Sequence, residues 1–110
     1  MTRKPTLPPA PDHLTPEAAK WWSRFVEGWM IDPAGLMILE GSLEAFDRMR
    51  QAQAQIAEDG PCVTDRFGQK KQHPAILTER DSRAALLRGL KSLGLDLEPI
   101  HAGPGRPRGS

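Results

Sequence analysis

The residues of this chain best suited to bind a ligand are basic side chains gathered in three segments. Lysine and arginine neutralise the phosphates of nucleic acids, and arginines in extended segments enter the minor groove of duplex DNA. The same charges could instead serve only to keep the chain soluble. The pattern therefore indicates three candidate DNA-binding clusters: Arg3 and Lys4, then Arg66, Lys70 and Lys71, then Arg106 and Arg108.

Groups that could catalyse a reaction are poorly placed in the sequence. The chain has neither a phosphate-binding glycine loop nor a dinucleotide-binding fingerprint. Its histidines, His13, His73 and His101, fall in separate segments, and with one cysteine they give no familiar metal-ligand spacing. Cys62 and His73 could form a nucleophile–base pair, although we favour a structural role for both. The sequence therefore predicts no catalytic site, no metal site and no cofactor.

The composition is that of one small domain. The chain has 110 residues, with 15 Lys and Arg against 14 Asp and Glu, which gives a net charge of +1. That balance excludes a uniformly basic coat for nucleic acid. The lone cysteine favours a reducing compartment, and no apolar run approaches the roughly 18 residues of a membrane span. The start of the chain lacks the apolar stretch of a signal peptide, so we expect a soluble intracellular protein.

Three amphipathic helices account for most of the chain. Each predicted helix begins with a capping residue followed by a proline, which is well suited to the first position of a helix. Gly60-Pro61 ends the second helix, and Gly94 suits the end of the third. The sequence therefore predicts one helix beginning at Pro16, a second from Pro33 to about Ala57, and a third from Pro74 to about Leu93.

A short β-hairpin is predicted between the second and third helices, near residues 61–73. Val63 and Thr64 favour a strand, and Asp65-Arg66-Phe67-Gly68 is a typical turn sequence. An isolated hairpin is only marginally stable in water. We therefore expect this hairpin to lean on the helices.

Prolines and glycines crowd both ends of the chain. We expect residues 1–14 to form a flexible arm and residues 96–110 a flexible tail, which leaves 15–95 as the helical core and oligomerisation domain. A domain of this size buries only a modest core and often gains stability by forming oligomers.

Aromatic residues mark the buried side of the first helix. Trp21, Trp22 and Trp29 share helical spacing with Phe25, so we expect all three tryptophans to pack into the core. The alternative is that they stack on the bases of a single-stranded nucleic acid. The first helix should cover the apolar side of the second.

The third helix has more apolar surface than one contact requires, because its leucines spread over more than half of the helical wheel. Burial of that surface between subunits would drive assembly. Residues 32–59 hold six acids and two bases, a net charge of −4, and residues 76–95 hold four bases and two acids, a net charge of +2. Ion pairs between these segments would select the partner rather than add much energy. The predicted oligomerisation residues are Leu86, Leu87, Leu90 and Leu93, with Arg80, Glu40 and Glu44.

The order of these features resembles the small terminase subunit of tailed bacteriophages, specifically its P27-type family. The resemblance covers about residues 5–100, and only the chain end departs, because Asp96 and Glu98 stand where the family often has a basic segment. The matching motifs are Thr15-Pro16-Glu17-Ala18 with Trp21-Trp22, then Leu39, Leu43 and Asp47, then Gly60, then Gly68-Gln69-Lys70-Lys71-Gln72-His73-Pro74-Ala75, and finally Leu93-Gly94-Leu95 before Pro99.

The resemblance implies a non-enzymatic component of genome packaging in the host cell cytoplasm. Such small subunits form homo-oligomeric rings, recognise double-stranded viral DNA and regulate the large terminase subunit, which carries the ATPase and nuclease. Together with the helical pattern, it predicts a mainly α fold: three helices, a short β-hairpin between the second and third, and assembly into a ring.

Two other functions are compatible with the residues alone. The first is a protein–protein adaptor that binds no DNA and docks partners on the acidic stripe of the second helix. The second is a small regulator with a helix-turn-helix, although its second helix is acidic where a recognition helix should read bases.

Overall fold

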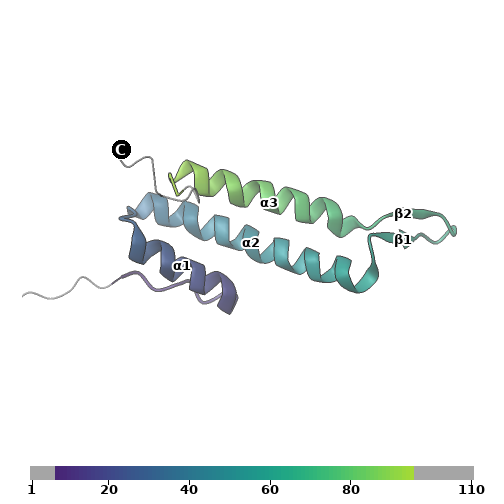
Figure 1. The fold of residues 1–110 in the computed structure, drawn as a ribbon, viewed down its shortest axis with the longest axis horizontal. Helices are drawn as coiled ribbons and strands as arrows, with labels where there is room; N and C mark the ends of the chain where they lie inside the picture. The colour runs from purple at the N-terminus through teal and green to yellow at the C-terminus, as the bar shows by residue number, and fades with distance from the viewer. Residues whose placement is uncertain (1–6, 96–110) are drawn as a thin grey trace, which may run out of the picture.

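The computed structural model describes residues 7–95, which form three helices and a two-stranded hairpin (Figure 1). The predicted mainly α fold, with the hairpin between the second and third helices, is confirmed. The elements are α1 (Pro16–Gly28), α2 (Pro33–Asp59), β1 (Cys62–Thr64), β2 (Lys70–Gln72) and α3 (Pro74–Ser92).

Each helix begins as its sequence predicts, with a side-chain cap and then a proline. The Thr15 hydroxyl accepts a hydrogen bond from the Ala18 amide at 3.2 Å, and the Asp32 carboxylate accepts one from Gly35 at 2.7 Å. Both bonds satisfy amides that the first helical turn leaves without a partner. At its other end α2 runs two residues further than expected, because only Gly60, with a φ of +84°, breaks the helical path.

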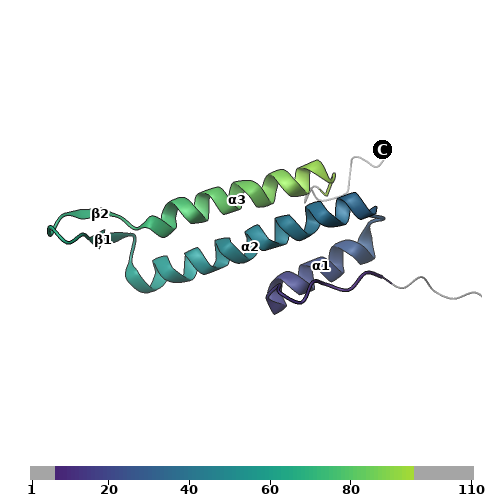
Figure 2. The same ribbon diagram turned by 180° about the vertical axis from the view of Figure 1, so that it is seen from behind.

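The helices lie side by side with α2 in the middle and antiparallel to both neighbours (Figures 1 and 2). α3 follows α2 along most of its length, whereas α1 covers only its first half. The first helix therefore covers α2 as expected, but it shares this role with α3, which makes the longer contact. The centre of the core is formed by Leu39 and Leu43 of α2, both almost completely buried.

Small residues let α2 and α3 approach closely. Ser42, Ala45 and Ala52 are buried along α2 at the spacing of one helical face. A Cβ atom added to Gly89 of α3 would lie 1.8 Å from the Ser42 hydroxyl oxygen. The contact therefore has no room for a side chain at position 89.

The segment before α1 is packed rather than loose over residues 7–14. The indole nitrogen of Trp22 donates a hydrogen bond to the Pro8 carbonyl at 2.9 Å, and Leu14 is buried in the core. The expectation of a flexible arm over residues 1–14 is therefore wrong for this part. Residues 1–6 lie outside the described residues, as does the predicted tail.

The expectation that all three tryptophans are buried is also wrong. Trp22 is buried, but Trp21 and Trp29 are each 38% exposed. Both lie beside the ring of Phe25, with centroids 6.1 and 5.7 Å away. The reason is that α1 packs on a single neighbouring helix, so the flanks of its apolar side stay open to solvent.

Candidate functional site

The hairpin projects from the end of the α2–α3 pair and away from the helices (Figures 1 and 2). The expectation that it leans on the helices is therefore wrong. Its strands pair antiparallel, with Val63 opposite Lys71 and Thr64 opposite Lys70. Every residue from 66 to 72 is exposed. The side chains of the hairpin can therefore be reached by a partner from nearly all directions.

Local hydrogen bonds give the tip a defined shape without help from the helices. The Asp65 carboxylate accepts from the amides of Phe67 and Gln69, each at 2.9 Å. The Asp65 amide donates to the Gln69 carbonyl at 2.9 Å, and Gly68 takes a φ of +79° that suits glycine. The turn predicted at residues 65–68 is thus built around Asp65.

The structure brings the predicted residues Arg66, Lys70 and Lys71 together on this hairpin. Side chains alternate between the faces of a strand, so Lys70 and Lys71 point to opposite faces. The Arg66 guanidinium lies 5.0 Å from the ring centroid of Phe67, which is itself 74% exposed. Phe67 was not among the predicted site residues, although a large aromatic residue inside a turn sequence was a visible sign. Arg3, Lys4, Arg106 and Arg108 lie outside the described residues.

A buried histidine fastens the base of the hairpin to both long helices. The ring of His73 accepts from the Ala75 amide at 3.0 Å through Nδ1, which caps α3. The neutral tautomer then carries its proton on Nε2, which donates to the Asp59 carboxylate at 2.9 Å. Both ring nitrogens are therefore in use, which leaves none to activate Cys62. The geometry supports the structural role that we favoured for His73, whereas Cys62 is exposed.

The predicted oligomerisation residues fall into different environments. Leu90 is 7% exposed and belongs to the core of its own subunit, and Leu86 and Leu93 pack against that core. Leu87 is 54% exposed and therefore available to a second copy. Arg80 pairs with Asp81, its own neighbour in the chain. The role of these residues in assembly stays a prediction.

Glu40 and Glu44 contact a residue that sequence reasoning did not associate with them. The His13 ring nitrogen Nε2 lies 2.7 Å from a Glu44 carboxylate oxygen and 3.6 Å from one of Glu40. The two glutamates are one helical turn apart, a pattern visible in the sequence. The approach of His13 could not be read from it, because the fold of residues 7–14 was not foreseen.

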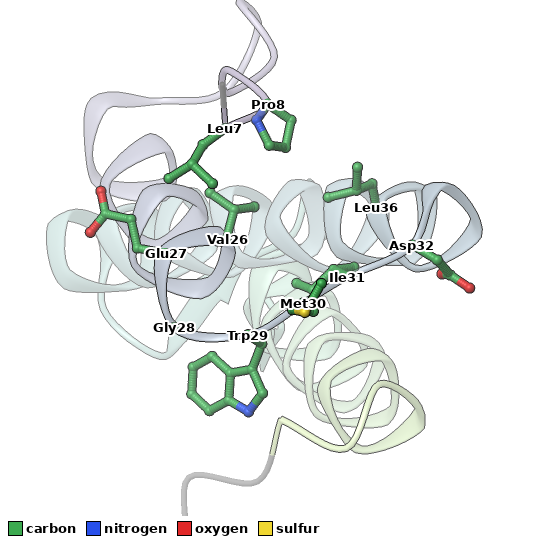
Figure 3. A pocket seen from close by; sticks show the side chains of 10 residues that line it. All are labelled: Leu7, Pro8, Val26, Glu27, Gly28, Trp29, Met30, Ile31, Asp32 and Leu36. Carbon is green, nitrogen blue, oxygen red and sulfur yellow. The ribbon is translucent and has the colours of Figure 1, made fainter. Parts of the chain in front are cut away.

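A pocket in the described part of the chain lies at the junction of α1 and α2 (Figure 3). It measures about 560 Å³ and is mainly apolar, with Leu7, Val26 and Ile31 among its lining. Its two carboxylates, Glu27 and Asp32, lie at opposite ends (Figure 3). Asp32 is already engaged as the cap of α2. The pocket therefore lacks a pair of carboxylates positioned for general acid–base chemistry.

Comparison with known proteins identifies the family. A family model described as the small subunit of phage terminase matches residues 18–99, which include α2, the hairpin and α3 in full. None of the curated proteins and none of the solved structures matches the chain. No helix within residues 7–95 is both long and apolar enough to cross a membrane. The narrower P27-type assignment stays a prediction. Because the match covers most of the chain, the protein belongs to the family of phage terminase small subunits.

Proposed function

We propose that this terminase small subunit recognises double-stranded viral DNA through the β1–β2 hairpin during genome packaging. The observation that carries the proposal is the exposure of Arg66, Lys70 and Lys71 on an element that extends beyond the helices. Asp65 is the one acidic residue among positions 60–75, so the hairpin has a net charge of +2. Lysines and arginines on such an element reach phosphates without the rest of the surface approaching the duplex.

The opposite orientation of the two lysines fits a groove rather than a flat surface. A two-stranded ribbon is narrow enough to enter the major groove of B-form DNA. Lys70 and Lys71 would then meet phosphates on opposite walls of the groove. Phe67 at the tip offers an apolar contact to the base edges, with Arg66 beside it.

Assembly into a homo-oligomeric ring is the second part of the proposal. Several large apolar residues are exposed, and α3 alone leaves Leu77 and Leu87 open to solvent. A shallow groove of about 150 Å³ also runs between α1 and α3. It is lined by Trp21, Phe25, Leu43, Phe46, Arg50, Leu86 and Leu90. A ring would repeat a weak DNA contact many times, which raises avidity without a strongly basic chain. In this role the subunit is not itself an enzyme and regulates the large terminase subunit.

The two rival functions find less support in the geometry. The acidic stripe that an adaptor would use is partly engaged within the subunit, since Glu40 and Glu44 contact His13 and Asp47 binds Thr15. A helix-turn-helix crosses its two helices steeply. Here α1 and α2 run antiparallel (Figure 1).

The DNA proposal is tested by reversing the charge of the two hairpin lysines. We expect Lys70→Glu with Lys71→Glu to weaken binding to duplex DNA by tenfold or more at low salt and to reduce its dependence on salt concentration. The matched control is Lys20→Glu with Lys91→Glu, which reverses two exposed lysines on α1 and α3. Equal losses in both double variants, or none in the hairpin variant, would contradict the proposed site. Native mass spectrometry tests the ring, because a monomer at micromolar concentration would exclude it.

A further inference from the structure

Three side chains from two segments converge on one spot of the α2 surface. His13 comes from the segment before α1, and Glu40 and Glu44 stand one helical turn apart on α2, where side chains share a face. One donor atom of each side chain lies within 4.8 Å of the donor atoms of the other two. The imidazole therefore lies against two carboxylates rather than one.

The chain on the C-terminal side of His13 is anchored independently of these contacts. Leu14 is buried in the core. The Thr15 amide donates a hydrogen bond to the Asp47 carboxylate at 3.0 Å, and the Thr15 hydroxyl donates to the same group. Asp47 follows Glu44 by three residues on α2. These contacts hold the backbone of His13 over the two glutamates, which is the preorganisation that a binding site requires.

We propose that His13, Glu40 and Glu44 bind a divalent transition-metal cation of the zinc type. Imidazole nitrogen combined with carboxylate oxygen is a donor set that suits such ions, whereas magnesium and calcium prefer oxygen alone. Three protein ligands leave the remaining coordination positions to water. The His13 proton would rest on Nδ1, so that the Nε2 lone pair faces the ion.

The spacing of the donor atoms is compatible with this ion. Ligands at about 2.0–2.1 Å in a tetrahedral arrangement lie roughly 3.3 Å from one another. The two distances from His13 Nε2, 2.7 and 3.6 Å, fall on either side of that value. All three side chains are partly exposed, so their rotamers can adjust by the small amount needed. The bound ion would fasten the segment before α1 to the middle helix.

The test is a calorimetric titration of the full chain with ZnCl₂, with the imidazole ¹⁵N signals of the histidines followed by NMR. A Cys62→Ser background removes the exposed thiol as a competing ligand. We expect one ion per chain, a shift of the His13 signal, and an affinity for Zn²⁺ at least tenfold above that for Mg²⁺. His13→Gln and Glu44→Gln should each weaken Zn²⁺ binding by about tenfold or more.

The matched control is Glu58→Gln, which removes an exposed carboxylate from the same helix and should leave the affinity unchanged. Zn²⁺ binding within twofold of the parent in His13→Gln would overturn the proposal, because the ion would then be held elsewhere. Equal losses in Glu44→Gln and Glu58→Gln would overturn it as well, since they would indicate general attraction to a negative helix. Equal affinities for Zn²⁺ and Mg²⁺ would refute the assigned ion class.

Discussion

The α2–α3 contact and the hairpin at its end differ in how much space surrounds their residues. A Cβ atom added to Gly89 would meet the Ser42 hydroxyl at 1.8 Å, whereas one added to Gly68 at the tip would meet nothing within 4 Å. Gly68 is limited instead by its own backbone, with a φ of +79°. Stability and proposed recognition are therefore assigned to separate parts of the molecule, and substitutions can address one without the other.

The largest loss of stability is expected from a side chain added at Gly89. We expect Gly89→Val to lower the free energy of unfolding by about 3 kcal/mol, because the added side chain must push α2 and α3 apart. Urea unfolding followed by circular dichroism measures the loss. The matched control is Gly41→Val on α2, where a Cβ atom meets nothing within 4 Å. A similar loss at both positions would show that helix propensity, and not packing, limits these sites.

A smaller effect is expected at the junction of the two regions. His73→Ala removes the cap of α3 and the bond to Asp59, and should cost about 1–2 kcal/mol in the free energy of unfolding. His73→Asn keeps a side-chain acceptor for the cap and should recover part of the loss. If the alanine variant is as stable as the parent, the hairpin is held by its backbone bonds alone.

The smallest effect concerns the polar edge of the α2–α3 contact. Hydrogen bonds from Arg83 and then Gln53 hold the pKa of Glu79 below its ordinary value. A carboxyl group with a lowered pKa stabilises the fold at every pH above its unfolded-state pKa of about 4.3. This stabilisation is lost as the pH falls through the folded-state pKa. Glu79→Gln should therefore flatten the loss of stability below about pH 5. Denaturant midpoints of the parent and of the variant, measured from neutral to acidic pH, test this prediction. An equal fall of the midpoint with pH in both proteins would contradict it.

Local chemistry made most of the fold predictable. The three helix starts follow from a capping residue and a proline, and the hairpin turn follows from Asp65 and Gly68, so each could be located without knowing the rest of the chain. The hairpin's basic residues were foreseen for the same reason, because Lys70 and Lys71 are adjacent in the sequence.

Features that depend on distant packing were not predictable. Burial of Leu14 and the bond from Trp22 to Pro8 order a proline-rich segment that composition alone marks as flexible. That order is also what brings His13 to Glu44, 31 residues away. The exposure of Trp21 follows from α1 having one neighbour, which a helical wheel does not reveal.

Because α2 is one unbroken helix, its length fixes the direction in which the hairpin points. Each residue of a helix turns the chain by about 100°, so one insertion after Asp47 would swing the hairpin to another side of the subunit and move Ala52 out of line with α3. Changes in the length of α2 are therefore tolerable only in nearly whole turns and with a matching change in α3. The tip between Thr64 and Lys70 lies beyond both helices, so a change in its length would leave the packing of α2 against α3 intact.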